Sequence, residues 1–156
     1  MKKLNKPLYL VLVGLISFTW MNLAHSEGQD TFITRMPDSE IRNSLNNIHY
    51  DICECLAFFI AGSVKVKQQG ATDDDLAQVN EASIQLVELA RSLHQDKVTE
   101  ARIGLASDKM MKEMDYDYVN FSILLQNYQK KCVELSNDVY QEVFHLLVEA
   151  EKEGLL

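Results

Sequence analysis

One long stretch of apolar periodicity, from Tyr116 to Glu153, constrains the fold more than any other feature of the sequence. Its apolar residues recur every three or four positions, which places them on one face of an α-helix. They are Phe121, Leu125, Tyr128, Cys132, Leu135, Val139, Val143, Leu146 and Ala150. No glycine or proline interrupts the stretch before Gly154. We therefore expect a long amphipathic helix whose apolar face, with the thiol of Cys132 in it, packs on the rest of the chain.

The first 26 residues have the pattern of an export signal. Lysines at positions 2, 3 and 6 precede an apolar run over 8–21, and Ala24 and Ser26 are the small residues that a signal peptidase recognises. We expect cleavage after Ser26, a periplasmic location, and no membrane attachment of the cleaved chain. The alternative is a retained N-terminal anchor, because the segment 8–24 reaches the lower edge of the roughly 17 to 25 residues that span a bilayer.

Removal of this segment leaves a strongly acidic chain. The full sequence has 15 Lys and Arg against 23 Asp and Glu, and loss of the three lysines leaves 12 against 23, a net charge of −11. Such a surface repels phosphate backbones and anionic membrane faces. We therefore expect no nucleic-acid partner.

Three further helices are predicted before the long one. The polar segment 27–37 has no period and is expected to be a flexible leader. Asp38 or Ser39 caps a first helix that ends at Gly70. A capping box that starts at Thr72 opens the second helix, and the third begins near Asp96.

The third and fourth helices are predicted to separate at 115–117, where Asp115 and Asp117 can cap a new helix. A single helix over 96–153 would be about 85 Å long, which is unusual in a compact domain. Short connections make neighbouring helices antiparallel. We therefore predict an all-α domain over 38–156, an up-down-up-down four-helix bundle with long first and fourth helices.

The cysteines predict one internal disulfide. In the predicted bundle, the end of the first helix at Gln69 lies beside the start of the fourth helix at Tyr116. Cys55 lies about 21 Å from the first of these points and Cys132 about 24 Å from the second, so the two cysteines are at nearly the same height. Both lie on inward stripes, so a Cys55–Cys132 bond needs no rearrangement. By reducing the conformational entropy of the unfolded chain, the bond would stabilise the fold by up to roughly 4 kcal/mol. The alternatives are a Cys53–Cys132 bond and no bond.

Cys53 is left over and is expected to be a free, half-buried thiol on a helix flank shared with His49, or else a link between two chains. The same segment contains Cys55, which raises the alternative of a metal-binding or redox-thiol site formed by Cys53 and Cys55. A zinc or copper site needs converging thiolates and an imidazole, whereas these cysteines diverge on the helix. We expect no metal and no other cofactor.

No catalytic constellation is recognisable in the sequence. It contains no glycine-rich phosphate loop, no nucleophile elbow and no His-Glu-x-x-His segment. The sequence therefore favours a non-enzymatic protein that binds an unknown protein partner or forms a homodimer. Two regions are candidate partner surfaces: the aromatic residues Tyr116 and Tyr118 at a helix junction, and Val143 and Leu147 on the part of the fourth helix that outruns its neighbours. For the aromatic pair, the preferred interpretation is that it belongs to the core of the bundle and its rim, and an exposed anchor for a partner is the alternative.

Overall fold

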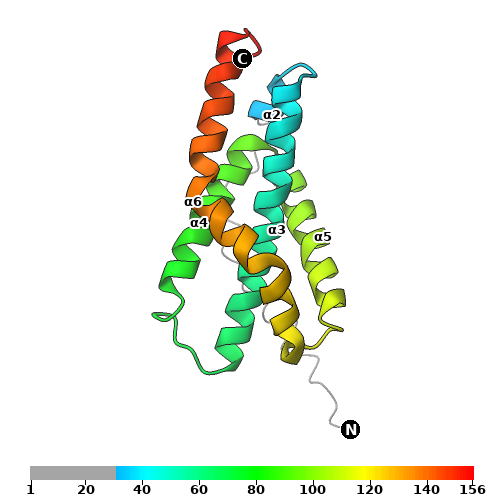
Figure 1. The fold of residues 1–156 in the computed structure, drawn as a ribbon, viewed down its shortest axis with the longest axis vertical. Helices are drawn as coiled ribbons and strands as arrows, with labels where there is room; N and C mark the ends of the chain where they lie inside the picture. Colours follow the sequence, from blue (N-terminus) through cyan, green and yellow to red (C-terminus); the bar gives the residue numbers. More distant parts are fainter. Residues whose placement is uncertain (1–30) are drawn as a thin grey trace.

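The computed structural model describes residues 31–156, and over this range the chain is helical with no β-strand (Figure 1). Its elements are α2 (Phe32–Arg35), α3 (Glu40–Gln68), α4 (Ala77–Leu93), α5 (Asp96–Glu113), the 3₁₀ helix η1 (Tyr118–Phe121) and α6 (Ser122–Lys152). The predicted signal over 1–26 and the leader residues 27–30 lie outside the described residues. Within 31–156, no helix combines the length and the apolar character that crossing a bilayer requires.

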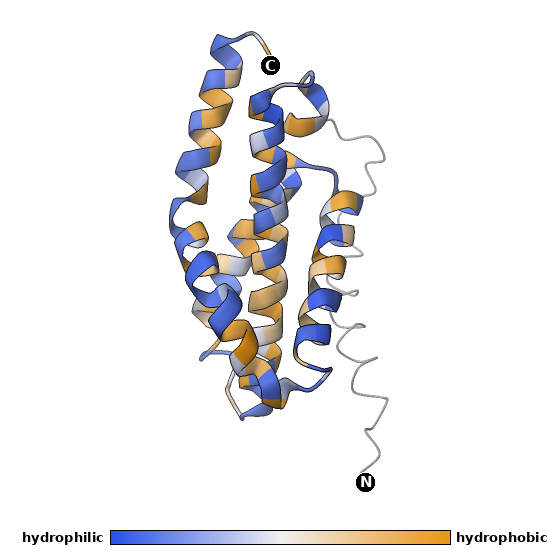
Figure 2. Cartoon of the chain, turned by 45° about the vertical axis from the view of Figure 1, so that its right-hand side comes forward, coloured by the Kyte–Doolittle hydropathy of each residue, from blue (hydrophilic) through white to orange (hydrophobic). Residues whose placement is uncertain are grey.

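α3 is the central element of the fold. α4, α5 and α6 each pack along α3 and contact one another far less. The consecutive residues 52–58 of α3 are all buried, because neighbouring helices cover this part of α3 on every side. Figure 2 shows the same segment as an apolar stretch of the central helix, whereas the surrounding helices alternate between apolar and hydrophilic residues.

The core consists of two clusters along α3, which we call upper and lower after their places in Figure 1. The upper cluster combines residues of α2, the first half of α3, the second half of α4 and the second half of α6. The lower cluster combines the second half of α3, α5, η1 and the first half of α6. Phe59 and Leu135 pack against both clusters, so the two are continuous.

The predicted helix ends of α3 are confirmed. The hydroxyl of Ser39 accepts a hydrogen bond from a backbone N–H of the first turn at 3.1 Å. After the helix, Gly70 has φ +94°, a conformation that favours glycine. The predicted capping box also forms, because Thr72 N–H donates to the carboxylate of Asp75 at 2.8 Å and the Asp75 N–H donates to the Thr72 hydroxyl at 3.3 Å. The residues 73–76 that follow form turns, so α4 begins later than predicted.

The predicted break between the third and fourth helices is confirmed. Asp115 and Tyr116 have φ values of 53° and 56°, in the left-handed region that ends a helix. Asp117 then caps η1, its carboxylate accepting a hydrogen bond from the Val119 N–H at 2.9 Å. The long helix therefore begins at Ser122, six residues later than the apolar period indicated.

The apolar stripe of the long helix differs from the prediction at its start. Leu125 is 39% exposed, and Leu124 is fully buried in its place. Phe121 ends η1 and Leu124 lies in the first turn of α6, three residues later, so the two side chains lie on the same face. The sequence pattern alone fits either leucine.

The segment before α3 is more ordered than a flexible leader. Residues 32–35 form α2, and Ile33 and Met36 are each only 3% exposed. Both side chains belong to the upper core cluster. The prediction of a flexible leader over 27–37 missed this helix, because four residues are too few to show a period.

Candidate functional site

Cys55 and Cys132 are brought together between α3 and α6, as the sequence predicted. Their sulfur atoms lie 2.07 Å apart, the distance of a covalent disulfide, and their Cα atoms lie 5.2 Å apart. Both side chains are fully buried in the lower core cluster. The pair links two helices that are 77 residues apart in the sequence.

A network of charged side chains lies beside this pair and joins three helices. Glu54 of α3 is only 6% exposed. Its carboxylate accepts hydrogen bonds from Lys109 of α5 at 3.0 Å and from Lys131 of α6 at 2.8 Å, and Lys131 also donates to Asp51 at 2.7 Å. Burial alone would raise the pKa of Glu54, but the hydrogen bonds and charges of the two lysines outweigh it and lower that pKa. This network holds α5 and α6 on α3.

Tyr128 extends the network on α6. Its hydroxyl donates a hydrogen bond to the carboxylate of Glu113 at 2.7 Å, and the ammonium of Lys109 lies 5.4 Å from the centre of its ring. Burial, followed by the charge and hydrogen bond of Glu113, raises the pKa of Tyr128. These contacts join α5 to α6 and have the character of a structural interface.

A second polar cluster is buried between α3 and α5. His49, Cys53 and Thr99 are each at most 1% exposed. Nε2 of His49 lies 2.9 Å from the Thr99 hydroxyl, and Nδ1 of His49 lies 2.7 Å from the guanidinium of Arg102. Arg102 also donates to the side chain and the backbone carbonyl of Asn46, at 2.8 and 3.2 Å. The polar side chains of α5 that face α3, Thr99 and Arg102, therefore find hydrogen-bond partners on α3.

The contacts of His49 define its protonation. A guanidinium can only donate, so Nδ1 must accept, and the neutral ring carries its hydrogen on Nε2 and donates to Thr99. Burial, the charge of Arg102 and the charge of His94 together lower the pKa of His49 to about 3. The His94 ring lies 5.4 Å away between ring centres. His49 is therefore neutral at the pH at which most proteins operate.

The sequence placed Cys53 on a half-buried flank with His49, and this was wrong in degree. The thiol is free but only 1% exposed, because α5 packs over that flank of α3. Its sulfur lies 3.8 Å from Nε2 of His49 and 3.9 Å from the carbonyl oxygen of Thr99. Burial raises the pKa of this thiol to about 12, against which the charge of Arg102 acts only weakly. Such a thiol is a poor nucleophile and cannot reach a second chain while α5 is in place.

The same geometry does not suit a metal ion. The guanidinium of Arg102 occupies the Nδ1 side of His49 and would repel a cation. Cys55, the other cysteine considered for a metal, is paired with Cys132. Within residues 31–156, no three His, Cys, Asp or Glu side chains converge as metal ligands.

The predicted partner surfaces are only partly available. Tyr116 is 63% exposed, whereas Tyr118 is partly buried and packs on the lower core cluster. Val143 is only 4% exposed and Leu147 is partly buried against the upper core cluster, where residues of α2 and α3 lie. The expectation that Val143 is free for a partner was therefore wrong, because α2 and the first half of α3 were not foreseen as its cover.

Sequence reasoning missed a more exposed apolar surface on α6. Tyr140 is 44% and Phe144 is 69% exposed, and with Gln141, His145 and Val148 they line an open pocket of about 520 Å³. We call these five residues the α6 patch. Positions 140, 144 and 148 are four apart, a second stripe on α6 that the sequence contains and the core stripe concealed. The hydroxyl of Tyr140 donates to the carbonyl of Gln85 at 2.7 Å, which ties one end of the patch to α4.

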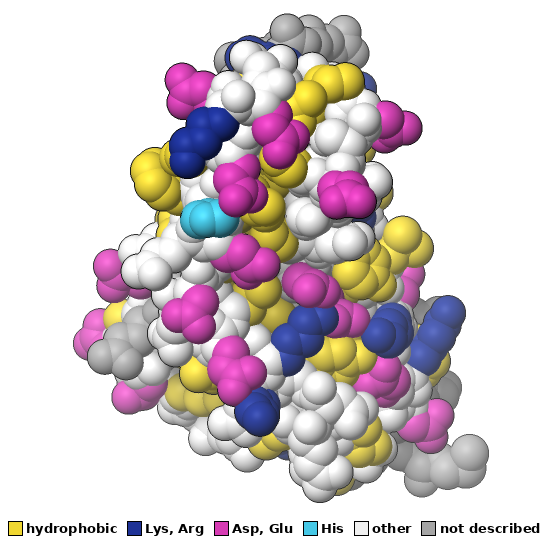
Figure 3. All heavy atoms as spheres, turned by 45° about the horizontal axis from the view of Figure 1, so that its top comes forward, with side chains coloured by type: hydrophobic (Ala, Val, Ile, Leu, Met, Phe, Trp, Pro, Cys, Tyr) yellow, Lys and Arg dark blue, Asp and Glu magenta, His cyan; other side chains and the backbone are white. Residues whose placement is uncertain are grey.

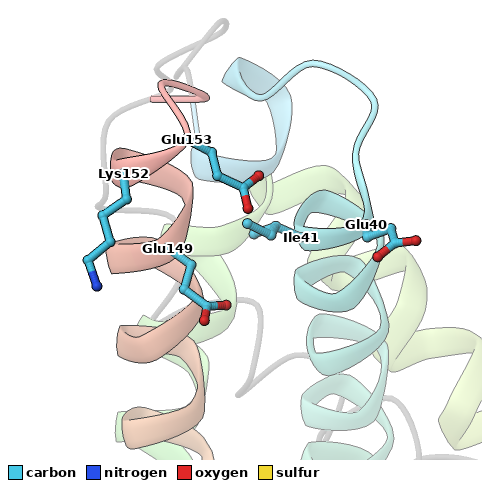
Figure 4. A pocket seen from close by; sticks show the side chains of 5 residues that line it. All are labelled: Glu40, Ile41, Glu149, Lys152 and Glu153. Carbon is cyan, nitrogen blue, oxygen red and sulfur yellow. The ribbon is translucent and has the colours of Figure 1, made fainter.

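A second hollow lies between the start of α3 and the end of α6 (Figure 4). It is lined by Glu40, Ile41, Glu149, Lys152 and Glu153. In Figure 4 the carboxylates of Glu149 and Glu153 lie toward α3, whereas Lys152 points away from the hollow. The hollow therefore adds negative charge to this end of the molecule.

Comparison with known proteins gives no relative from which a function could be transferred. The sequence matches no protein-family description, and neither a curated protein nor a solved structure is significantly similar to it.

Proposed function

We propose that the protein is an exported periplasmic helical protein that acts by binding another protein chain and has no catalytic activity of its own. The observation that carries this proposal is the α6 patch. Aromatic residues are enriched in protein interfaces relative to the rest of the surface, and here two of them stand exposed on one ridge. Phe144 is the strongest case, since 69% of it is exposed.

The buried groups support a binding role over catalysis. Two nucleophilic groups contact Nε2 of His49, the Thr99 hydroxyl at 2.9 Å and the Cys53 sulfur at 3.8 Å, and all three side chains are closed off from solvent. Burial raises the pKa of Cys53 and lowers that of His49, the opposite of what an activated thiol needs. The alternative of a metal or redox-thiol site at Cys53 and Cys55 has no specific observation in its favour.

We further infer that α3 to α6 form one up-down-up-down bundle fastened by the Cys55–Cys132 bond. The packing of α4, α5 and α6 on α3 and the short connections between successive helices support this topology. Export is supported by the N-terminal sequence pattern and by the paired cysteines, because disulfides persist in oxidising compartments.

Photocrosslinking in cells tests the proposed function. A photoreactive amino acid in place of Phe144 is expected to give a covalent adduct with another chain, whereas the same amino acid at Leu105 of α5, which is 70% exposed, is not. Cell fractionation with intact-mass measurement on the same sample is expected to find the protein in the periplasm, beginning at Glu27. Absence of an adduct at Phe144, or equal adducts at both positions, would contradict a binding role for the patch.

A further inference from the structure

We propose that the α6 patch binds a basic amphipathic helix of another protein. This inference rests on the proposed function and specifies the chemistry of the partner. It combines three observations: the ridge that the patch forms along α6, the absence of any strand between residues 31 and 156 to which an extended peptide could add, and the excess of carboxylates around the patch.

The shape of the patch suits a helix. Tyr140, Phe144 and Val148 lie four residues apart and so form one ridge along α6. Ridges of this spacing pack into the grooves between the corresponding ridges of another helix. The pocket beside Phe144 then receives the apolar side chains of the incoming helix. An amphipathic helix that presents an apolar face to a groove is a common mode of peptide recognition.

An extended peptide fits less well. Strand addition supplies its affinity through backbone hydrogen bonds to an exposed sheet edge. The chain has no β-strand between residues 31 and 156, and the backbone of α6 is hydrogen-bonded within the helix. A helix already pairs the backbone groups of its interior, so it can dock on such a surface without leaving them unpaired.

The surroundings of the patch are acidic. Residues 1–30 hold three of the 15 basic and two of the 23 acidic residues, so the described part has 12 against 21, a net charge of −9. On α4, next to the Gln85 that Tyr140 contacts, the 59% exposed Ile84 has Glu81 and Glu88 one turn away on either side. Glu88 is close enough for its charge to raise the pKa of Tyr140, after the larger effect of burial. Figure 3 shows exposed apolar side chains among acidic ones over the upper face.

These charges favour a basic partner over a second copy of the chain. Two copies joined through the patch would bring the same α4 carboxylates, Glu81 and Glu88, toward each other, which is unfavourable. Basic side chains that flank the apolar stripe of a partner helix would instead meet these carboxylates with opposite charge. This attraction also raises the rate of association, and the increase becomes smaller as the salt concentration rises.

Two labelled peptides with the same apolar stripe test the proposal, one with lysines and one with glutamates on the polar face. Fluorescence anisotropy with the protein, purified after expression of the full chain, is expected to show that the lysine peptide binds at least about tenfold tighter than the glutamate peptide. Phe144→Glu is expected to weaken binding of the lysine peptide at least about tenfold. Leu105→Glu adds the same charge at a similarly exposed site on α5 and is expected to leave binding within about twofold.

The decisive result is whether Phe144→Glu weakens or strengthens binding of the lysine peptide. Phe144→Glu adds a carboxylate, so a surface that attracts the peptide by charge alone would bind it more tightly, which would overturn the proposal. Equal binding of both peptides, or binding of neither, would also overturn it. A molecular mass in light scattering that halves on Phe144→Glu would show that a second copy occupies the patch instead. A photocrosslink at Phe144 to a protein without a basic helix would leave the proposed function intact and refute only this inference.

Discussion

Nδ1 of His49 on α3 lies 2.7 Å from the guanidinium of Arg102 on α5, with both groups inside the interface of the two helices. A proton added to this nitrogen would replace an attractive hydrogen bond by a repulsion between two cations. The contact therefore makes the attachment of α5 to α3 sensitive to acid.

We predict that the protein loses stability between pH 7 and pH 5 through His49. Its pKa is lowered from 6.5 to about 3 by burial, Arg102 and His94, so the unfolded chain binds more protons than the folded one between these two values. Stability is thus fully present above pH 6.5 and falls as the pH falls toward 3. At pH 5 the loss is about 2 kcal/mol, at about 1.4 kcal/mol per pKa unit.

Denaturant unfolding of the protein and of His49→Gln across pH 5–7 measures this effect. His49→Gln is expected to be less stable at pH 7 and to have a flatter pH dependence. His145→Gln removes an imidazole that is 73% exposed and is the control for the loss of a histidine as such. It is expected to lower the free energy of unfolding at pH 7 less than His49→Gln does. Identical slopes for the protein and His49→Gln would refute the assignment.

We predict that the Cys55–Cys132 pair is a disulfide that stabilises the fold by up to about 4 kcal/mol, since it closes a loop across 77 residues. Peptide mapping before and after reduction is expected to show a mass difference of two hydrogens at this pair alone. Cys55→Ser with Cys132→Ser is expected to lower the free energy of unfolding and Cys53→Ala to lower it much less. A larger loss from Cys53→Ala would contradict this ranking.

We predict that Glu54→Gln lowers the free energy of unfolding by about 1 to 3 kcal/mol, because a buried carboxylate that accepts from two lysines is lost. Glu134, 3.9 Å from Lys130 on the exposed side of α6, is the matched control. Glu134→Gln is expected to change stability by less than about 0.5 kcal/mol. Chemical denaturation of both variants at pH 7 decides the point, and equal losses would show that Glu54 has no special role.

We predict that Gly104→Ala stabilises the protein by about 0.5 to 1 kcal/mol. Gly104 lies inside α5, where alanine is the better helix former, and no atom lies within 4 Å of the added methyl group. Gly70→Ala is the opposite case, because its φ of +94° strains an alanine, and a loss of about 1 kcal/mol is expected. Thermal unfolding of the two variants should therefore shift the midpoint in opposite directions.

The features that follow from local pattern were predictable from the sequence. The cap at Ser39 and the break at 115–117 depend on residues a few positions apart. The Cys55–Cys132 pairing depends on the distance of each cysteine from the shared end of its helix, which follows from the residue count and the rise per residue.

The features that depend on which helix covers which face were not predictable in this way. Cys53 and His49 are fully buried because α5 lies against one flank of α3. The spacing of four residues places them on that flank but does not tell which helix covers it. Val143 is covered because α2 and the start of α3 pack at that end. Phe144 was overlooked for the converse reason: a phenylalanine four residues from other apolar side chains suggests a core, and only the position of the helices shows that it faces outward.

The bridge between Cys55 and Cys132 also divides the chain mechanically. It closes α4 and α5 into a ring, with the first half of α3 and the last part of α6 as two arms outside it. A pulling force on the two arms would pass from one helix to the other through the sulfur atoms and bypass the ring. Stretched by its ends, the oxidised molecule should therefore peel open only down to the bridge, and the reduced molecule should extend fully.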